Sequence, residues 1–232
     1  MSPKIRSSSE STDDYLKAIL ELSGVGGAED APVSSNDLAA RLGVRAASVT
    51  GMLQKLAAQK PMLVLYEKHR GVRLSAAGKR RAWEIVRHHR LLELFLHDVL
   101  KYSWDEVHEE AERLEHFISE RFEDRVAAIL GDPEIDPHGH VIPHRNGTIP
   151  YREETALCDW AVETPAVISS VSDRDPASLR DLHGMGLVPG ATLKVVQKNQ
   201  NASLLVCIDG REQRVRISNE LAGLIAMRAK QR

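Results

Sequence analysis

Two short amphipathic segments joined by a glycine constrain the fold of this chain more than any other feature of its sequence. Residues 36–42 place their leucines on one helical face, and Ser34 or Ser35 can cap that helix at its start. After Gly43, residues 46–59 carry a second apolar stripe, with exposed polar positions near their beginning. A short helix, a tight turn and a second helix of this kind are typical of a helix-turn-helix.

A predicted β-hairpin follows these two helices. Residues 62–66 and 72–74 are predicted to be short strands on either side of a basic turn, and Ser75 begins a long helix that continues to about Leu100. Residues 41–90 hold 12 Lys and Arg against two Glu, although the whole chain has a net charge of −2. This concentration of positive charge indicates a surface for a polyanion, so the segment is interpreted as a winged helix-turn-helix that binds DNA.

The acidic middle of the chain carries a candidate metal site. Residues 104–129 are predicted to form one helix, on which Glu112, Glu115 and His116 share a face because they are three and four residues apart. His108 lies one turn earlier on the same stripe. Carboxylates and imidazoles together suit Mn²⁺ or Fe²⁺, whereas Ca²⁺ prefers oxygen ligands alone and structural Zn²⁺ prefers thiolates or a tighter tetrahedral set.

Two other segments can complete this site. The preceding helix carries His89 and Glu93 four residues apart, and antiparallel packing of the two helices can face them toward the first set. Asp14, on a predicted helix of residues 12–22, can close the site from another side. The alternative is that these residues form an exposed, charged helix face without a metal. The remaining histidines are expected in surface or loop positions: His69, His88, His97, His138, His140 and His144.

The last part of the chain changes in character. Residues 131–151 hold four prolines, and a Pro-rich linker is predicted at residues 138–161. Short β-type runs in residues 162–232 predict a small β-barrel domain. The expected fold class is therefore mainly α with a small β domain, with the winged helix-turn-helix in residues 1–75 and further helices in residues 76–137. No apolar run approaches the roughly 20 residues that span a bilayer, so we expect a cytoplasmic protein without a membrane partner.

Several of these motifs, in this order, resemble the diphtheria-toxin-repressor and manganese-transport-regulator family of metal-dependent repressors. They are Asp-Tyr-Leu at residues 14–16, the wing segment at 66–79, RHHRLLELFL at 87–96 and EVHEEAERLEHFIS at 106–119. The Pro-rich segment and the C-terminal β domain resemble the SH3-like, or FeoA-like, extension of the longer members. The resemblance covers essentially the whole chain, and it implies a homodimer in which residues 76–137 form the metal-binding and dimerisation domain.

The resemblance also implies one or two metal ions per subunit. The primary ligands that it implies are Asp14, Glu112, Glu115 and His116. The second site that it implies uses His89, Glu93 and His108. A polar residue of the SH3-like domain often completes that second site, and Asp175 is the best match for it, with Ser178 a poorer one.

Ligand type favours manganese over iron. Iron-type members of the family have a sulfur ligand at the positions of Glu112 and Asp14, whereas manganese-type members have carboxylates, whose harder oxygens suit Mn²⁺. Manganese-type members are usually short, however, and have a further acidic residue at the position of Lys17. The chain therefore combines manganese-type ligands with an iron-type length, and Fe²⁺ is the alternative metal.

The chain is expected to bind double-stranded operator DNA as a dimer when it is loaded with metal, and to repress metal-uptake genes. An ion shared by Asp14 and Glu112 would join the DNA-binding half to the dimerisation half and favour recognition helices spaced for successive major grooves. Base contacts are expected from the start of the second helix of the motif, and phosphate or minor-groove contacts from the wing. The expected DNA-contacting residues are Arg45, Ala47, Ser48, Thr50, Gly51, Lys68, Arg70 and Arg73.

Two other functions are kept as alternatives. In a DNA-binding protein whose metal is purely structural, the affinity for DNA would not follow the concentration of free metal. A dinuclear carboxylate enzyme would need paired Glu-x-x-His motifs, whereas this chain has one complete segment with a Glu–His spacing of four. Because an enzyme would also leave the basic hairpin unexplained, no catalytic residues are expected.

Overall fold

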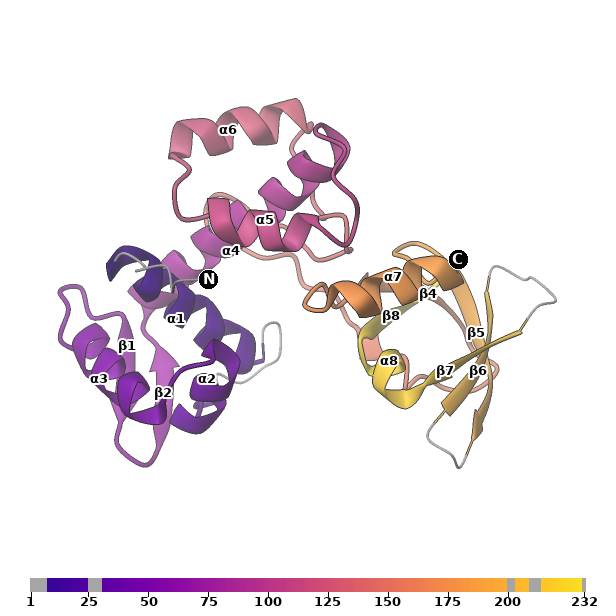
Figure 1. The fold of residues 1–232 in the computed structure, drawn as a ribbon, viewed down its shortest axis with the longest axis horizontal. Helices are drawn as coiled ribbons and strands as arrows, with labels where there is room; N and C mark the ends of the chain where they lie inside the picture. The colour runs from indigo at the N-terminus through magenta and orange to yellow at the C-terminus, as the bar shows by residue number, and fades with distance from the viewer. Residues whose placement is uncertain (1–7, 25–30, 200–202, 209–213, 231–232) are drawn as a thin grey trace. The chain divides into compact units, whose positions relative to one another are not determined.

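The computed structural model describes residues 8–24, 31–199, 203–208 and 214–230. It divides the chain into two compact units: unit 1 comprises residues 1–88, 115–118 and 143–149, and unit 2 comprises residues 89–114, 119–142 and 150–232. None of the described helices combines the length and the hydropathy needed to cross a lipid bilayer. Helices dominate up to residue 130 and strands dominate after it (Figure 1), which confirms the prediction of a mainly α chain with a small β domain.

Unit 1 combines helices with a β-hairpin. The helices are α1 (Ser8–Leu22), α2 (Ser35–Leu42) and α3 (Ala46–Ala57), and the antiparallel hairpin pairs β1 (Val64–Glu67) with β2 (Gly71–Leu74). One apolar core joins all of them: Leu16 and Ile19 of α1, Leu38 of α2 and Leu53 of α3 are fully buried there. Since α1 shares this core with α2 and α3, a displacement of α1 disturbs the packing of both of them.

Local sequence signals explain where these helices begin and end. The Ser34 hydroxyl accepts a hydrogen bond from the Asp37 backbone N–H at 3.1 Å, which caps α2. Gly43 ends α2 with φ 64°, a left-handed conformation that glycine adopts without strain. The predicted helix-turn-helix with a wing is therefore confirmed, with element ends within about three residues of those expected.

Unit 2 begins within the long helix α4 (Ala76–Asp98), which leaves unit 1 after His88. It continues with α5 (Val107–Leu114) and α6 (Glu120–Ile129). The prediction of one helix over residues 104–129 is wrong, because the chain leaves the helix after Leu114 and starts α6 anew. The Ser119 hydroxyl accepts from the Phe122 backbone N–H at 3.3 Å, and such an N-cap competes with a continuous helix.

The C-terminal part of unit 2 is an antiparallel sheet with strand order β3-β8-β4-β5-β6-β7. Its elements are β3 (Thr155–Ala156), β4 (Pro165–Val171), α7 (Pro176–Met185), β5 (Thr192–Asn199), β6 (Ser203–Ile208), β7 (Arg214–Ser218), α8 (Asn219–Gly223) and β8 (Ile225–Ala229). Alternating residues of the strands, such as Val195 and Val206, meet Leu179 and Leu182 of α7 in a second core. This core holds the loop between β4 and α7 at a fixed place in unit 2.

Part of the Pro-rich segment expected to be a linker is packed. His138 is completely buried and Ile142 is 2% exposed, and Ile142 joins Leu91 of α4 and Val126 of α6 in a small core. An isolated β-bridge between Ile135 and Val141 closes this turn. The segment therefore brings polar side chains, among them His138, into the interior of unit 2.

Gly78 of α4 offers a direct test of the packing in unit 1. A Cβ atom at this position would lie 2.0 Å from the Leu63 backbone oxygen, so Gly78→Ala must shift backbone and is expected to destabilise the chain by about 1–3 kcal/mol. Gly51→Ala on α3 is the matched control, because nothing lies within 4 Å of its Cβ and alanine favours a helix. Urea unfolding measures both variants. Equal stability of the two would contradict the close approach of α4 to Leu63.

Candidate metal centres

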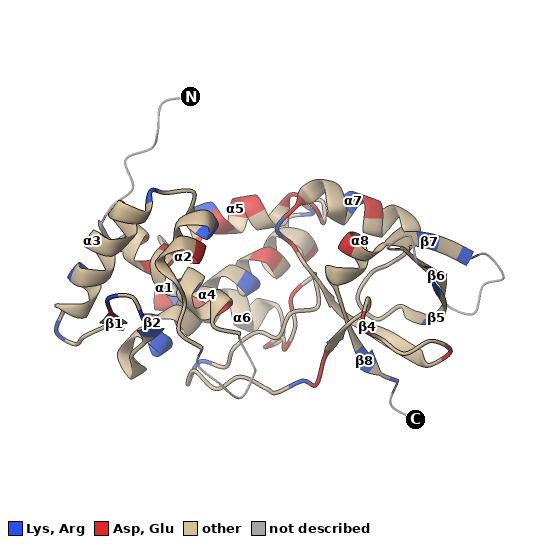
Figure 2. Ribbon diagram, turned by 90° about the horizontal axis from the view of Figure 1, so that it is seen from below, with Lys and Arg blue, Asp and Glu red and all other residues tan. Residues whose placement is uncertain are grey.

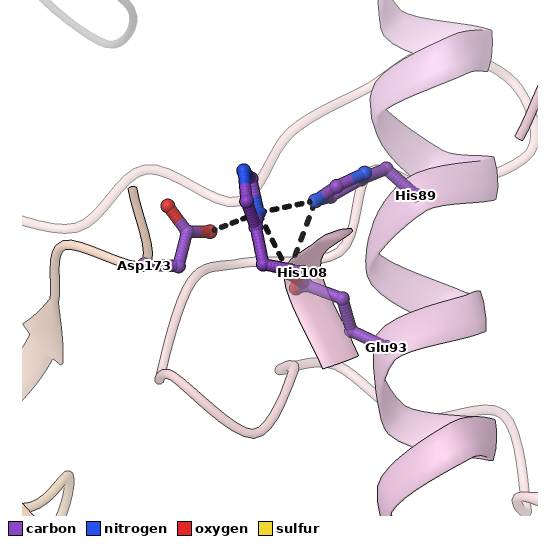
Figure 3. A group of neighbouring side chains, drawn as sticks. All are labelled: His89, Glu93, His108 and Asp173. Atoms are coloured by element: carbon purple, nitrogen blue, oxygen red, sulfur yellow. Dashed lines mark hydrogen bonds and ion pairs between the residues drawn. The ribbon is translucent and has the colours of Figure 1, made fainter. Parts of the chain in front are cut away.

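A cluster of side chains in unit 2 gathers around Glu93. His89 and Glu93 are four residues apart on α4, and His108 projects toward them from α5 (Figure 3). Glu93 Oε1 lies 3.0 Å from His89 Nε2 and 3.2 Å from His108 Nδ1, and the two nitrogens are 3.1 Å apart. The Glu93 side chain is completely buried and that of His89 is 5% exposed. These three residues, predicted from the sequence as one site, are brought together.

The geometry of this cluster fits a divalent transition metal. Its three donor atoms form a nearly equilateral triangle with edges of 3.0–3.2 Å. Ligands at right angles around one ion are about 3 Å apart when the metal–ligand bonds are about 2.1 Å. An imidazole pair with a carboxylate suits manganese, iron and zinc, so the residues present fit such an ion.

An aspartate from the loop between β4 and α7 completes the cluster, and it is Asp173. Its Oδ2 lies 3.6 Å from His108 Nδ1, on the side away from His89 (Figure 3). Asp175, the residue expected from the sequence, is exposed and caps α7 by accepting from the Ala177 and Ser178 backbone N–H groups. The Asp175 carboxylate serves the helix end, so its role as a ligand stays a prediction, and Asp173 is the aspartate that lies beside His108.

His138 approaches Glu93 from the opposite side, and the sequence analysis missed it. Its Nδ1 lies 3.6 Å from Glu93 Oε2, and among the described residues neither atom has a hydrogen-bond partner although both are buried. The Trp104 carbonyl accepts from His138 Nε2 at 2.9 Å, so a neutral ring turns an unprotonated Nδ1 toward the carboxylate. A cation is therefore needed between these two atoms. The surface position expected for His138 is wrong.

In the absence of a metal, protons supply that positive charge. Burial opposes a charge on His138, but its interaction with Glu93 raises the pKa of the imidazole to about 9. Burial likewise opposes ionisation of Glu93, yet the charge of His89 and hydrogen bonds from the neighbouring imidazoles hold the pKa of Glu93 well below its usual range. The cluster is thus an anionic Glu93 carboxylate beside a protonated His138 imidazole.

Asp136 holds the histidine-containing turn in place. Its Oδ1 accepts from the backbone N–H groups of His138 and His140, at 2.8 and 3.0 Å. Its Oδ2 lies 3.2 Å from His140 Nδ1 and 3.7 Å from Arg90 Nε. His140 Nδ1 is also 3.6 Å from Asp173 Oδ2, so this turn is connected to the cluster at two points. The sequence signal for this turn is one acidic residue and two histidines within five positions, from Asp136 to His140.

A second candidate centre lies in unit 1, between α1 and residues 115–118. His116 Nε2 lies 3.1 Å from Asp14 Oδ1 and 3.6 Å from Glu115 Oε1. The side chains of Asp14 and His116 are 12% and 7% exposed, and that of Glu115 is fully buried. One imidazole and two carboxylates again form a donor set that suits Mn²⁺ or Fe²⁺.

Asp13 supports His116 on the other side of its ring. Asp13 Oδ2 lies 3.8 Å from His116 Nδ1, a buried atom without a hydrogen-bond partner among the described residues, and Asp13 Oδ1 accepts from Arg81 Nε at 2.6 Å. Burial opposes a charge on His116, but the carboxylates of Asp13, Asp14 and Glu115 raise the pKa of the imidazole to about 9. Asp13 thus adds negative charge behind the His116 ring without a hydrogen bond to it.

The remaining predicted residue of the primary site is Glu112, and His88 and His97 are two of the histidines expected at the surface. Glu112 is on α5 in unit 2, half-buried, with Oε1 4.0 Å from His108 Nε2. His88, expected at the surface, is a buried residue of unit 1 whose Nδ1 lies 3.1 Å from the Glu115 carbonyl oxygen. His97 is partly exposed and pairs with Asp98, as expected for a surface histidine.

The residues predicted to contact DNA lie at the surface of unit 1. Figure 2 shows basic residues along α3 and on the β1–β2 hairpin. Arg45, which precedes α3 as its N-cap, is exposed, and Thr50 is partly buried, with its hydroxyl donating to the Ala46 carbonyl. The other predicted contacts are all exposed: Ala47, Ser48, Gly51, Lys68, Arg70 and Arg73.

Models of three protein domains match successive parts of the chain. "Iron dependent repressor, N-terminal DNA binding domain" matches residues 8–72. "Iron dependent repressor, metal binding and dimerisation domain" matches residues 75–144. The FeoA domain matches residues 155–229, in agreement with the predicted FeoA-like extension.

Similar proteins agree with these matches. The diphtheria toxin repressor of Corynebacterium jeikeium (strain K411) is 32% identical over 227 residues, covering 85% of this chain and 92% of the relative. A solved manganese-dependent transcriptional repressor in complex with manganese has a TM-score of 0.86 and 35% identity, over 94% of this chain and 100% of that one. The structure of ScaR with bound Zn²⁺ has a TM-score of 0.79 and 28% identity, over 94% and 99%. The chain therefore belongs to the diphtheria toxin repressor family of metal-dependent repressors.

Proposed function

We propose that this chain is a metal-dependent transcriptional regulator that binds double-stranded operator DNA as a homodimer when it is loaded with metal, and that it represses metal-uptake genes. The triangle of donor atoms from His89, Glu93 and His108 carries this proposal. A chain that has both a metal site and a winged helix-turn-helix can make its DNA binding depend on the concentration of the ion. A dimerisation domain matched at residues 75–144 supports the homodimer.

Mn²⁺ is the proposed metal, with Fe²⁺ as the alternative, and one or two ions bind per subunit. The donors of both centres are carboxylate oxygens and imidazole nitrogens, whose hardness suits Mn²⁺. The neighbouring manganese-dependent repressor supports this choice, and the iron-dependent family models keep Fe²⁺ open. When bound, the ion supplies positive charge to buried carboxylates, and it takes no part in catalysis.

The residues of unit 1 suggest how metal could act on DNA binding. Asp14 lies on α1, whose Leu16 and Ile19 are part of the core shared with α2 and α3. An ion held by Asp14 and His116 would attach α1 to residues 115–118, and would thereby fix the helix on which the helix-turn-helix packs. Binding free energy for metal then favours one arrangement of the DNA-reading helices, which is linkage between two sites.

The rival functions make different predictions for one titration. Fluorescence polarisation of a labelled fragment of the protein's own promoter is measured with Mn²⁺, with Fe²⁺ under anaerobic conditions, and with a chelator. A regulator shows DNA affinity that follows free metal, whereas a purely structural metal gives affinity that is unchanged across the titration. A dinuclear enzyme built on Glu93 and the surrounding imidazoles would leave the basic surface of α3 and the hairpin without a role. This function is therefore disfavoured.

His116→Ala should remove metal-dependent DNA binding. Loss of the imidazole takes a proposed ligand from Asp14 and Glu115, so operator affinity in Mn²⁺ should fall at least about tenfold. His97→Ala is the control, because His97 is a partly exposed histidine that pairs with Asp98. Undiminished Mn²⁺-dependent binding in His116→Ala would remove His116 from the ligand set.

Two aspartates in the same loop test the centre in unit 2. Asp173→Asn should weaken one class of Mn²⁺ sites by about 10–100-fold in isothermal titration calorimetry, because a carboxylate close to His108 loses its charge. Asp175→Asn should leave Mn²⁺ binding unchanged, since asparagine also caps a helix well. The reverse result would return the ligand role to Asp175.

Basic residues of unit 1 should separate into two classes in DNA binding. Arg45→Ala should weaken operator binding by about 1–3 kcal/mol and leave random DNA little affected if Arg45 reads a base. Lys68→Ala on the wing should weaken both DNAs equally and reduce the slope of log affinity against log salt by about 1. Equal loss on both DNAs for Arg45→Ala would make it a phosphate contact.

A further inference from the structure

Trp104 lies in the turn before α5 and holds the turn that carries His138 at two points. Its indole Nε1 donates to the Pro137 carbonyl at 2.9 Å, and its own carbonyl accepts from His138 Nε2 at 2.9 Å. The two rings also pack on each other, with centroids 5.2 Å apart and an interplanar angle of 37°. One residue therefore fixes both the backbone before His138 and the direction in which its imidazole points.

The direction of that imidazole matters because of the group that faces its other nitrogen. His138 Nδ1 lies 3.6 Å from Glu93 Oε2, and both atoms are buried without a hydrogen-bond partner among the described residues. When Nε2 donates to the Trp104 carbonyl, a neutral ring keeps Nδ1 as its acceptor, which is the form that can bind a metal. The hydrogen bond to Trp104 thus sets both the tautomer and the orientation of His138.

Trp104 and its neighbour Asp105 also contact helix α7. The Trp104 and His183 rings have centroids 5.8 Å apart, and Asp105 Oδ2 lies 2.7 Å from Arg180 Nη1. Trp104 is partly buried against the core to which the sheet and α7 both contribute. The loop with Asp173 leads directly into this helix, so contacts that hold α7 also determine where that aspartate lies.

We infer that Trp104 is a positioning residue for the centre in unit 2. It joins the His138 turn to α7 and thereby keeps two separate donors, His138 Nδ1 and the Asp173 carboxylate, at the cluster around Glu93. The inference rests on the proposed function, since it presumes that this centre holds metal. The Trp104 side chain offers no ligand atom and acts only through the two elements that it joins.

Trp160 provides the comparison with a purely structural role. It packs against the same core, and its Nε1 donates to the Thr164 carbonyl at 3.1 Å. Replacing either indole by alanine removes apolar surface and one hydrogen bond to a backbone carbonyl, so both variants should melt at a lower temperature in chelator. Only Trp104→Ala should also lose affinity for metal.

The experiment measures Mn²⁺ binding by isothermal titration calorimetry in full-length chains that carry His116→Ala, which removes a proposed ligand from the centre in unit 1. Trp104→Ala should bind Mn²⁺ at least about tenfold more weakly than this parent, and Trp160→Ala should bind as the parent does. Trp104→Phe keeps an aromatic ring against His138 and loses only the N–H donor, so its affinity should fall between the two. If Trp104→Ala does not fold, Trp104→Phe decides in its place.

A double-mutant cycle separates the positioning of His138 from a general loosening of unit 2. Trp104→Phe removes the donor that holds Pro137, so its effect should vanish when His138→Ala has already removed the imidazole. An equal loss of Mn²⁺ affinity in both backgrounds, or parental affinity in both Trp104 variants, overturns the inference. If the His116→Ala parent itself binds no Mn²⁺, the proposed function fails, and this inference falls with it.

Discussion

The completely buried carboxylate of Glu93 is the constraint on which the centre in unit 2 depends. An ionised carboxylate without solvent needs positive charge beside it, and here the nearest groups are His89, His108 and His138. Three separate parts of the chain, α4, α5 and the turn after Pro137, supply those imidazoles. Their convergence on one anion leaves a central place for positive charge, which a proton on His138 supplies without metal and a divalent ion would supply with it; this is the physical case for a metal.

The winged helix-turn-helix was predictable because its signals are local. Ser34 caps α2, Gly43 permits the turn, and the apolar periodicity of α3 is visible within a dozen residues. The i,i+4 spacing of His89 and Glu93 is local in the same sense, since a single helix brings the two side chains together. These particular predictions rested on local signals, and the structure bears out both the helices and the closeness of His89 to Glu93.

The failures concern residues whose place is decided by tertiary packing. Asp173 and Asp175 are two positions apart in one loop, and only the core beneath β4 and α7 decides which of them faces His108. His138 lies in a sequence of prolines and glycines that suggests an exposed linker, yet packing around Ile142 carries it into the interior. The cap at Ser119 overrode the apolar periodicity that predicted a single helix across residues 104–129.

The two centres satisfy their buried carboxylates in different ways when metal is absent. Around Glu93 part of the positive charge comes from the proton on the His138 imidazole, and an imidazole nitrogen gives up its proton if it becomes a metal ligand. At Glu115 part of the positive charge comes from the ammonium of Lys17. Unlike a proton on an imidazole, this ammonium is covalently part of the chain. Under the proposed function, an ion at Glu93 would therefore take the place of protons, whereas an ion at Glu115 would share that carboxylate with the ammonium of Lys17.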